Sequence, residues 1–230
     1  MSFRRTVTNM AGSAAARRAA PAVASRGVRQ FLSKAVDGFP GFPGAREIAR
    51  KHLARTHDVD AAVKAVIDQH VRLAGAQGFV TNLGGVVTLA ISIPTNLVGL
   101  AILHVRMVAA IAHLRGYEIS APQVRAAALM TLLGEDGVRD AIKDRDLDSH
   151  PHDFAVGAGD IDPATLDKIT AQVTQALVTR IGGKNATLTI TRRVPIIGGA
   201  ISAGVDALAT HSVGRYADKE FPPHIMIERA

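Results

Sequence analysis

The sequence contains no cysteine and no tryptophan, and aromatic residues make up only 4% of it. Without cysteine there can be no disulfide, no thiol catalysis and no cysteine-ligated zinc site, which fits a reducing compartment. With so few aromatic side chains, the core must be built from Ala, Val, Leu and Ile. Because 47% of the 230 residues are hydrophobic, that core is large enough for a folded domain, and global disorder is excluded.

Acidic residues are missing from the start of the chain, since none occurs before Asp37. The first 60 residues carry 11 Lys or Arg and 4 Asp or Glu, whereas the remaining 170 carry 16 of each kind. The whole net charge of +7 therefore belongs to the N-terminal quarter. A basic segment of this kind is attracted to anionic lipid or to nucleic acid. The residues that we expect to contact an anionic membrane surface are Arg4, Arg5, Arg17, Arg18, Arg26, Arg29 and Lys34.

The basic segment shows no helix-turn-helix or RNA-binding signature, so we expect no specific nucleic-acid partner. Arg17 and Arg18 interrupt its Ala-rich run, which argues against a secretory signal. An organellar transit peptide and a solvated tail stay open as alternatives. The Gly- and Pro-rich stretch from Asp37 to Gly44 is the expected linker. We therefore divide the chain into a flexible basic arm with its linker (1–44), a helical domain (45–221) and a C-terminal tail (222–230).

Helical periodicity dominates beyond the linker. TLTITRR, Thr187 to Arg193, is β-branched and alternating, which favours a strand, but no partner strand is evident. We predict a helix there and keep the strand as the alternative. The remaining predicted helices run from Ala45 to Arg55, from a cap at Asp58 or Asp60 through Gln77 to a stop at Gly78, from a capping box of Ser120 and Gln123 to Leu133 with a stop at Gly134, and from Asp162 and Pro163 to Gly182.

The 33 positions from Leu73 to Val105 hold no formally charged residue. This exceeds the roughly 20 residues that span a bilayer. However, Pro94 interrupts the run, and the chain soon meets His104 and Arg106. The half before Pro94 would be a helix of about 22 Å, shorter than the roughly 30 Å hydrocarbon core. We therefore expect a helical hairpin in the protein core, with partial insertion into one leaflet and a true span as the alternatives.

A second Gly-rich apolar segment runs from Pro195 to Thr210. Its small residues at four-residue spacing would let this helix approach the hairpin closely. Asp206 would then be buried, and a buried carboxylate needs a partner. We predict buried polar pairing between Arg106 and Asp206. The small-residue pairs are Gly199 with Ala203 and Ala200 with Gly204.

An acidic and His-rich stretch, DRDLDSHPHD, is the one candidate for metal chemistry. It fails as an EF-hand loop because Ser149 and Ala155 stand where Gly and Glu are required. A solvated loop is our interpretation, with a weak metal site as the alternative. The HExxH, P-loop and GxSxG patterns are all missing, so we expect no enzyme, no cofactor and no catalytic residue. The weak metal candidates are Asp144, Asp146, Asp148, His150 and His152.

Two blocks carry a resemblance to a known family. GFVTNLGGVVTLAISIPTNLVGLAILHVRMVAAIAHLRGYE, from Gly78 to Glu118, joins a Gly-rich apolar segment, a proline and a long helix bearing Arg. VPIIGGAISAGVDALATHSVGRYADKEF, from Val194 to Phe221, is similar to a C-terminal family block in which Asn is common where Asp206 stands. Together they resemble the bacterial EcsC family over residues 45–221. The resemblance implies a bacterial, intracellular or membrane-associated helical protein, and it supplies no catalytic residues.

We therefore predict an all-α fold, a helical bundle around a central Gly-rich apolar helical hairpin. The function we expect is that of a non-catalytic accessory protein in the bacterial cytoplasm, peripherally associated with the inner face of the membrane. The family resemblance links it to ABC-type export, so a membrane transporter is an expected partner beside lipid. The two alternatives are a soluble helical module that binds an apolar ligand or lipid, and a metal-dependent enzyme that uses the acidic His loop.

Overall fold

The computed structural model describes residues 33–39, 41–80, 95–157, 161–162, 164–173 and 195–224, with side chains omitted at 77–80, 95–98 and 195–203. Throughout these ranges the regular structure is helical, apart from an isolated bridge between Phe39 and Phe42. The predicted all-α class is confirmed. The connection of the predicted Gly-rich hairpin and the stretch Thr187–Arg193 both lie outside the described residues.

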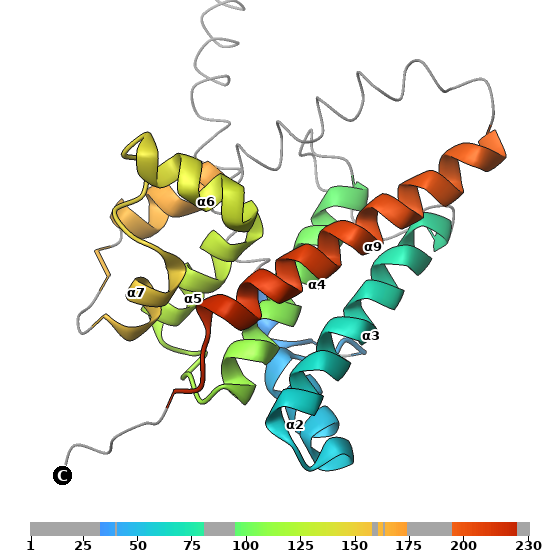
Figure 1. Cartoon of the computed structure of the whole chain (residues 1–230), viewed down its shortest axis with the longest axis horizontal. Helices are drawn as coiled ribbons and strands as arrows, with labels where there is room; N and C mark the ends of the chain where they lie inside the picture. The colour runs from blue at the N-terminus through green and yellow to red at the C-terminus, as the bar shows by residue number, and fades with distance from the viewer. Residues whose placement is uncertain are drawn as a thin grey trace, which may run out of the picture.

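Three long helices form the centre of the fold (Figure 1). α3 (Val59–Val80) and α9 (Pro195–Glu220) lie side by side, and α4 (Thr95–Leu114) packs against both. α3 and α9 are close at Gly214, where a Cβ atom would come within 2.9 Å of Ile67 Cγ1. Glycine is therefore required there by space, because any larger residue would push the two helices apart.

The close contact between α3 and α9 at Gly214 is not at a position that the small-residue pattern predicted. A Cβ atom added at Gly204 would meet no atom of the described part within 4 Å. The prediction that Gly204 lets two helix backbones approach was therefore wrong. The spacing of small residues identifies every position where a close contact could form. Which of these positions does form one depends on where the partner helix lies.

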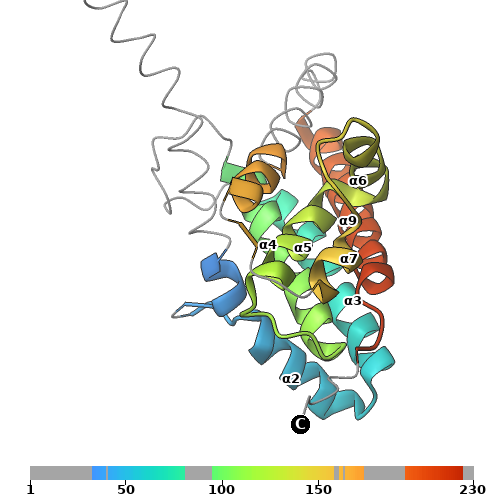
Figure 2. The ribbon, with the colours of Figure 1, turned by 90° about the vertical axis from the view of Figure 1, so that its left-hand side faces the viewer.

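The shorter helices cover the two sides of this centre. α2 (Ala45–Thr56) packs across α3 and α4 at the base of the molecule (Figure 2). On the other side of α4 lie the remaining elements, which contact one another and α9 (Figure 1). These are α5 (Pro122–Met130), the 3-10 turn η1 (Thr131–Leu133), α6 (Gly134–Lys143) and α7 (Pro151–Val156).

The core is aliphatic, as the composition predicted. Every residue from Met107 to Ala112 on α4 is buried, so this helix is enclosed on all sides. Alanines at these positions and on α5, including Ala126 and Ala127, let neighbouring helices come close. The few aromatic side chains in the core include Phe221, which meets Tyr117 edge-on with 5.1 Å between ring centroids.

Some helix ends follow the predicted signals. The backbone N–H of Ala61 donates to Asp58 Oδ1 over 2.7 Å, which confirms Asp58 as the cap of α3. The described part of α4 starts at Thr95, and the predicted break at Pro94 lies outside the described residues. The predicted stop at Gly78 was wrong, because α3 continues to Val80. A glycine costs a helix only about 1 kcal/mol, which packing along α9 can offset.

The predicted capping box at Ser120 was also wrong. α5 starts two residues later, at Pro122, with Ala121 as its N-cap and no side-chain cap. The Ser120 hydroxyl is used instead by Glu118, to which it donates over 2.6 Å. Proline at the first helical position fixes the start of the helix without a cap. Gly134 does mark a break, with φ +75°, but the chain continues at once into α6.

The chain before α2 is also part of the packed structure. Residues 33–37 are helical, and Ala35 and Val36 are buried in the hydrophobic core. The sequence assigned this stretch to the arm and linker. The packed structure therefore begins at residue 33 or earlier, ahead of the family-like region from residue 45. Further along the chain, a helical segment at 164–173 follows Asp162, as predicted, and its Ile169 and Val173 side chains are buried.

No helix in the described ranges combines the length and the apolar character needed to cross a bilayer.

Candidate functional site

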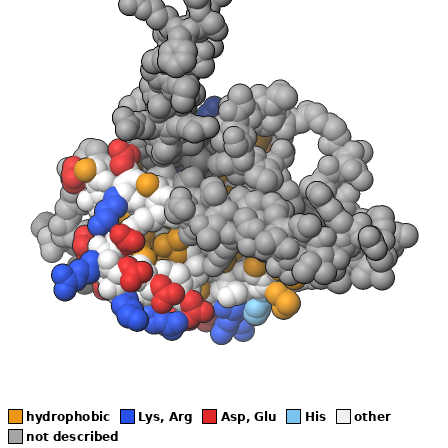
Figure 3. Space-filling view, turned by 90° about the horizontal axis from the view of Figure 1, so that it is seen from above, with side chains coloured by type: hydrophobic (Ala, Val, Ile, Leu, Met, Phe, Trp, Pro, Cys, Tyr) orange, Lys and Arg blue, Asp and Glu red, His pale blue; other side chains and the backbone are white. Residues whose placement is uncertain are grey.

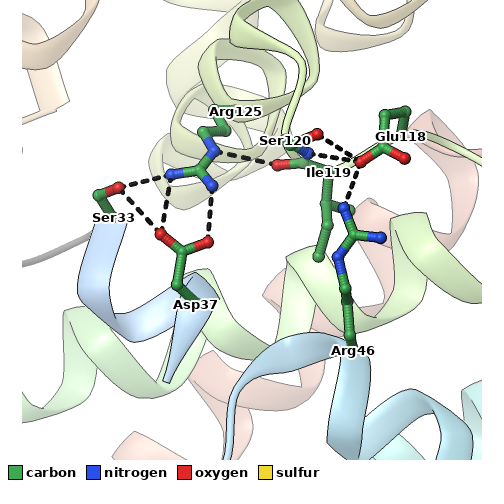
Figure 4. Close-up of polar contacts among 7 residues, drawn as sticks. All are labelled: Ser33, Asp37, Arg46, Glu118, Ile119, Ser120 and Arg125. Carbon is green, nitrogen blue, oxygen red and sulfur yellow. Dashed lines mark hydrogen bonds and ion pairs between the residues drawn. The ribbon is translucent and has the colours of Figure 1, made fainter. Parts of the chain in front are cut away.

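A network on one side of α5 ties down the segment before α2 (Figure 4). Arg125 donates from Nη2 to Asp37 Oδ1 over 2.6 Å and from Nη1 to Ser33 Oγ over 2.5 Å. Its Nε atom donates to the carbonyl of Ile119 over 3.0 Å, which fixes the guanidinium plane. The arrangement positions the segment that leads into the Phe39–Phe42 turn.

A second network holds the turn after α4 (Figure 4). The Glu118 carboxylate accepts from the hydroxyl and the backbone N–H of Ser120 and pairs with Arg46 of α2. These contacts, those of Ser120 first, lower the pKa of Glu118 to about 2. The pair is exposed, so its role is to join α2 to the turn and its contribution to stability is small.

Arg106, at the centre of α4, carries a buried positive charge. Its residue is only 4% exposed, and its guanidinium lies over the ring of Phe42, with 3.9 Å from Cζ to the ring centroid. Within the described part, the buried Nε atom has no hydrogen-bond partner. Burial lowers the pKa of Arg106 to about 10, so the side chain stays charged at neutral pH. A desolvated cation–π contact stabilises the charge by about 2 kcal/mol, which is less than the cost of burying that charge.

Two histidines from neighbouring helices join Arg106 in the interior. His70 of α3 is fully buried and uses Nδ1 to donate to the Val66 carbonyl over 2.7 Å. Burial, and then electrostatic interactions with Arg106 and His52, lower the pKa of His70 to about 4, although its hydrogen bond to Val66 acts in the opposite direction. His70 is therefore neutral at pH 7, and its Nε2 atom is a buried lone pair without a partner in the described residues. His52 of α2 makes a hydrogen bond through its Nε2 atom with Gln69 Oε1, at 2.5 Å.

Asp206 of α9, the predicted partner of Arg106, is also buried at 7% exposure. The group that the structure places against the Arg106 guanidinium is Phe42, so pairing with Asp206 stays a prediction. Beside Asp206, the Thr210 hydroxyl donates to the Asp206 carbonyl over 2.7 Å and lies 2.9 Å from His104 Nε2. This buried chain of polar groups joins α4 to α9.

The acidic His loop is spread over several environments. Asp144 caps the end of α6 and His150 precedes α7. His152 lies with Nδ1 3.4 Å from the Tyr117 hydroxyl, and its backbone N–H donates to Glu220 Oε2 over 3.1 Å. Glu220 thus caps the start of α7 from α9. In the described ranges, no three His, Asp or Glu side chains converge on a position that could hold a metal ion.

Three large apolar side chains are exposed on α3 and α9. In Figure 1 the C-terminal end of α3 and the N-terminal end of α9 lie together. Leu73 of α3 is 37% exposed, and Val205 and Leu208 of α9 are 43% and 73% exposed. Figure 3 shows charged side chains of both signs along one edge, followed by hydrophobic ones near the margin of the grey region. The sequence joined to this end is uncharged from 194 to 205 and from 73 to 105.

The basic residues of the arm mostly fall outside the described part of the chain, since six of the seven lie before residue 33. Lys34 is described and its side chain is exposed. The predicted contact of these residues with an anionic surface stays a prediction.

Sequence reasoning anticipated a buried Arg106 but missed the groups around it. Phe42 lies in a Gly- and Pro-rich stretch, DGFPGFPG, whose composition indicates a linker. The signal in that stretch was the repeated GFPG, which places two aromatic rings three residues apart. In the structure the rings of Phe39 and Phe42 stack with centroids 4.8 Å apart, and Phe42 continues the stack to Arg106. His70 belongs to none of the sequence motifs described above.

The fold and these networks define a small all-α domain with a buried basic centre and one apolar end. The sequence model of the EcsC protein family matches residues 45–222, and the chain belongs to this family. The search of curated proteins and the search of solved structures each returned no match.

Proposed function

We propose that this protein is a non-catalytic accessory protein that binds peripherally to the anionic inner face of a bacterial membrane, beside an export transporter. The observation that carries the proposal is the group of exposed large apolar side chains on α3 and α9, namely Leu73, Val205 and Leu208, of which Leu208 is 73% exposed. Burying one Leu side chain contributes about 1.5–3 kcal/mol. In the sequence, the positions from 73 to 105 and from 194 to 205 carry no charge.

The charge of the basic N-terminal segment also supports binding to an anionic membrane. Its seven Lys and Arg residues before Asp37 are not offset by any acid. Each basic residue near an anionic leaflet contributes about 1 kcal/mol, and salt weakens this attraction within a Debye length of about 10 Å. An apolar end together with a basic arm is the pairing of signals that stable peripheral binding requires.

The test is co-sedimentation of the full chain with vesicles of phosphatidylglycerol and phosphatidylcholine. We expect binding that falls with added salt, and that falls about tenfold for Leu208→Ser, which removes about 1.4 kcal/mol of apolar contact. Leu53→Ser is the matched control, because Leu53 is 37% exposed but lies on α2, at the base of the molecule.

Removal of the arm completes the test. The deletion should stop at residue 32, because Ala35 and Val36 belong to the core. We expect this variant to lose most of its salt-sensitive binding while it keeps its helical circular-dichroism spectrum. Binding that ignores salt, the deletion and Leu208→Ser alike would count against the proposal, whereas a copurifying lipid with no vesicle binding would favour a soluble lipid-binding module.

A further inference from the structure

Phe39 is the one aromatic residue among the large hydrophobic residues that are exposed in the described part of the chain, at 47%. A single exposed hydrophobic side chain needs no explanation by itself, because protein surfaces ordinarily carry several. The feature that distinguishes Phe39 is the rigid turn that holds it in this position. Figure 2 shows this turn, in blue, projecting from one edge of the molecule ahead of α2.

Glycines close the base of the turn, and backbone hydrogen bonds close its tip. Phe39 and Phe42 exchange two backbone hydrogen bonds, at 3.0 and 2.8 Å. Gly38, at φ +85°, has no room for a side chain, because a Cβ atom there would lie 2.6 Å from the Gly44 nitrogen. A Cβ atom at Gly44 would in turn lie 2.5 Å from the Asp37 carbonyl oxygen. The conformation of the turn is therefore fixed before it meets any partner.

The turn is also fastened to the domain. Just before it, Asp37 pairs with Arg125 of α5 at 2.6 Å. Within it, the ring of Phe39 stacks on that of Phe42, which covers Arg106. One face of the Phe39 ring is thus held against the domain, while 47% of the residue stays exposed. A side chain that is already ordered loses little conformational entropy when it binds.

The chain just before the turn supplies the charge that an anionic surface attracts. Residues 1–36 hold seven Lys and Arg and no acid. The last of the seven, Lys34, is exposed and comes shortly before Phe39. The carboxylate of Asp37 is paired with Arg125, so its charge does not oppose this attraction. Basic residues next to an ordered apolar side chain are the two signals that stable peripheral membrane binding combines.

We propose that Phe39 is a membrane anchor, which inserts its exposed edge among the headgroups of anionic phospholipids while the basic arm binds their phosphates. The inference rests on the proposed membrane function and adds a contact beside the exposed side chains of α3 and α9. The arm attracts the domain to the surface, and the ring adds apolar contact there. Aromatic side chains suit this depth, because the apolar face of membrane-surface segments carries them at the boundary of headgroups and acyl chains.

The lack of tryptophan in the chain makes a direct test possible. Phe39→Trp places a single indole at the turn and keeps an aromatic ring against Phe42. With vesicles of phosphatidylglycerol and phosphatidylcholine, we expect its emission to shift to shorter wavelength and to be quenched by brominated acyl chains. The matched control is Val59→Trp, at a residue 36% exposed between Asp58 and Asp60, whose charges oppose an anionic surface. The emission of the control should stay unchanged.

Loss of the ring provides a second measurement. Phe39→Ser should weaken co-sedimentation with these vesicles by roughly fivefold, because part of a Phe side chain no longer leaves water on binding. Val59→Ser should leave binding as it is. Circular dichroism shows whether the variants keep their helical fold. Since Phe39→Trp preserves the stack on Phe42, the fluorescence test stands even if Phe39→Ser fails to fold.

The outcomes separate this contact from the proposed function. Vesicle binding by Phe39→Trp without a change in its emission would overturn the contact and leave the membrane function standing. Equal shifts in both Trp variants would overturn it as well, because they would indicate general adsorption. An emission shifted without vesicles, and dependent on protein concentration, would assign the ring to a contact between copies of the chain instead. If the wild type does not bind vesicles at all, the proposed function fails and this inference fails with it.

Discussion

The backbone N–H of His224 donates to the carbonyl of Arg115 over 2.8 Å, and this bond fastens the segment after α9 to the turn after α4. The ring of His224 also stacks on Tyr117, with 4.7 Å between centroids. Between these two contacts lies Gly116, at φ +93°, with the His224 carbonyl against the position of its missing Cβ atom. The turn therefore depends on glycine for both its backbone conformation and its space.

Gly116→Ala should destabilise the domain. A left-handed conformation costs a non-glycine residue about 1–2 kcal/mol, and the clash with His224 adds to this. We expect thermal unfolding about 4–8 °C lower for the variant, measured by circular dichroism. The matched control is Gly75→Ala on α3, where a Cβ atom meets nothing within 4 Å. That variant should be unchanged or more stable by about 0.5–1 kcal/mol, and equal losses at both sites would contradict the explanation.

The two ion pairs of Arg115 should differ in their coupling energies. Arg115 lies 2.6 Å from both Asp60 of α3 and Asp218 of α9, but the Asp60 side chain is 69% exposed and that of Asp218 only 25%. Exposed pairs are screened by water and salt. We expect a coupling energy of about 1 kcal/mol for Arg115 with Asp218 and roughly 0.3 kcal/mol with Asp60. Double-mutant cycles with Arg115→Gln, Asp218→Asn and Asp60→Asn measure both, and the reverse order would refute this ranking.

Buried His70 should make stability depend on pH in the mildly acid range. Burial, then Arg106 and His52, lower its pKa from 6.5 to about 4, so the unfolded chain binds more protons between these values. The contribution is complete above about pH 6.5 and is lost as the pH falls toward 4, by up to about 3 kcal/mol at roughly 1.4 kcal/mol per pKa unit. Urea unfolding of His70→Gln at several pH values should show a flatter profile than the wild type. His211→Gln, at an exposed position on α9, should leave the profile as it is.

The contact of Arg125 with Asp37 and Ser33 should hold the segment before α2 on the domain. Arg125→Gln removes the ion pair, so the amide of Gly38, which donates to the Lys34 carbonyl over 2.8 Å, should exchange its hydrogen faster. Hydrogen exchange followed by mass spectrometry over residues 33–44 measures this. Arg139→Gln on α6 should leave those residues unchanged. Unaltered exchange in the Arg125 variant would mean that burial of Ala35 and Val36 alone holds the segment.

Local signals predicted the parts of this fold that local physics controls. Asp58 caps α3 because a carboxylate accepts from a free N–H wherever it precedes a helix. The signals failed where another contact outweighed them: α3 runs through Gly78 beside α9, and Ser120 bonds Glu118 in place of the helix that follows it.

The candidate site also combines features that local sequence predicts with features that only tertiary contacts determine. Arg106 was predicted to pair with Asp206 in the interior, and Arg106 is buried. Its neighbour Phe42 comes from a stretch whose composition indicates a linker, and His70 is two helices away from that stretch in the chain. Neither proximity follows from spacing, because no periodicity connects a turn before α2 with the centre of α4.

By itself the sequence determined the helical class, the aliphatic core, the basic N-terminal segment and the family, since composition and short-range periodicity are properties of the chain. Only the tertiary structure decided which glycine is a close contact, Gly214 rather than Gly204, and which group meets the buried guanidinium. The physical reason is that burial and electrostatic pairing depend on distances between segments far apart in sequence. Those distances are set by how α2, α3, α4 and α9 pack together.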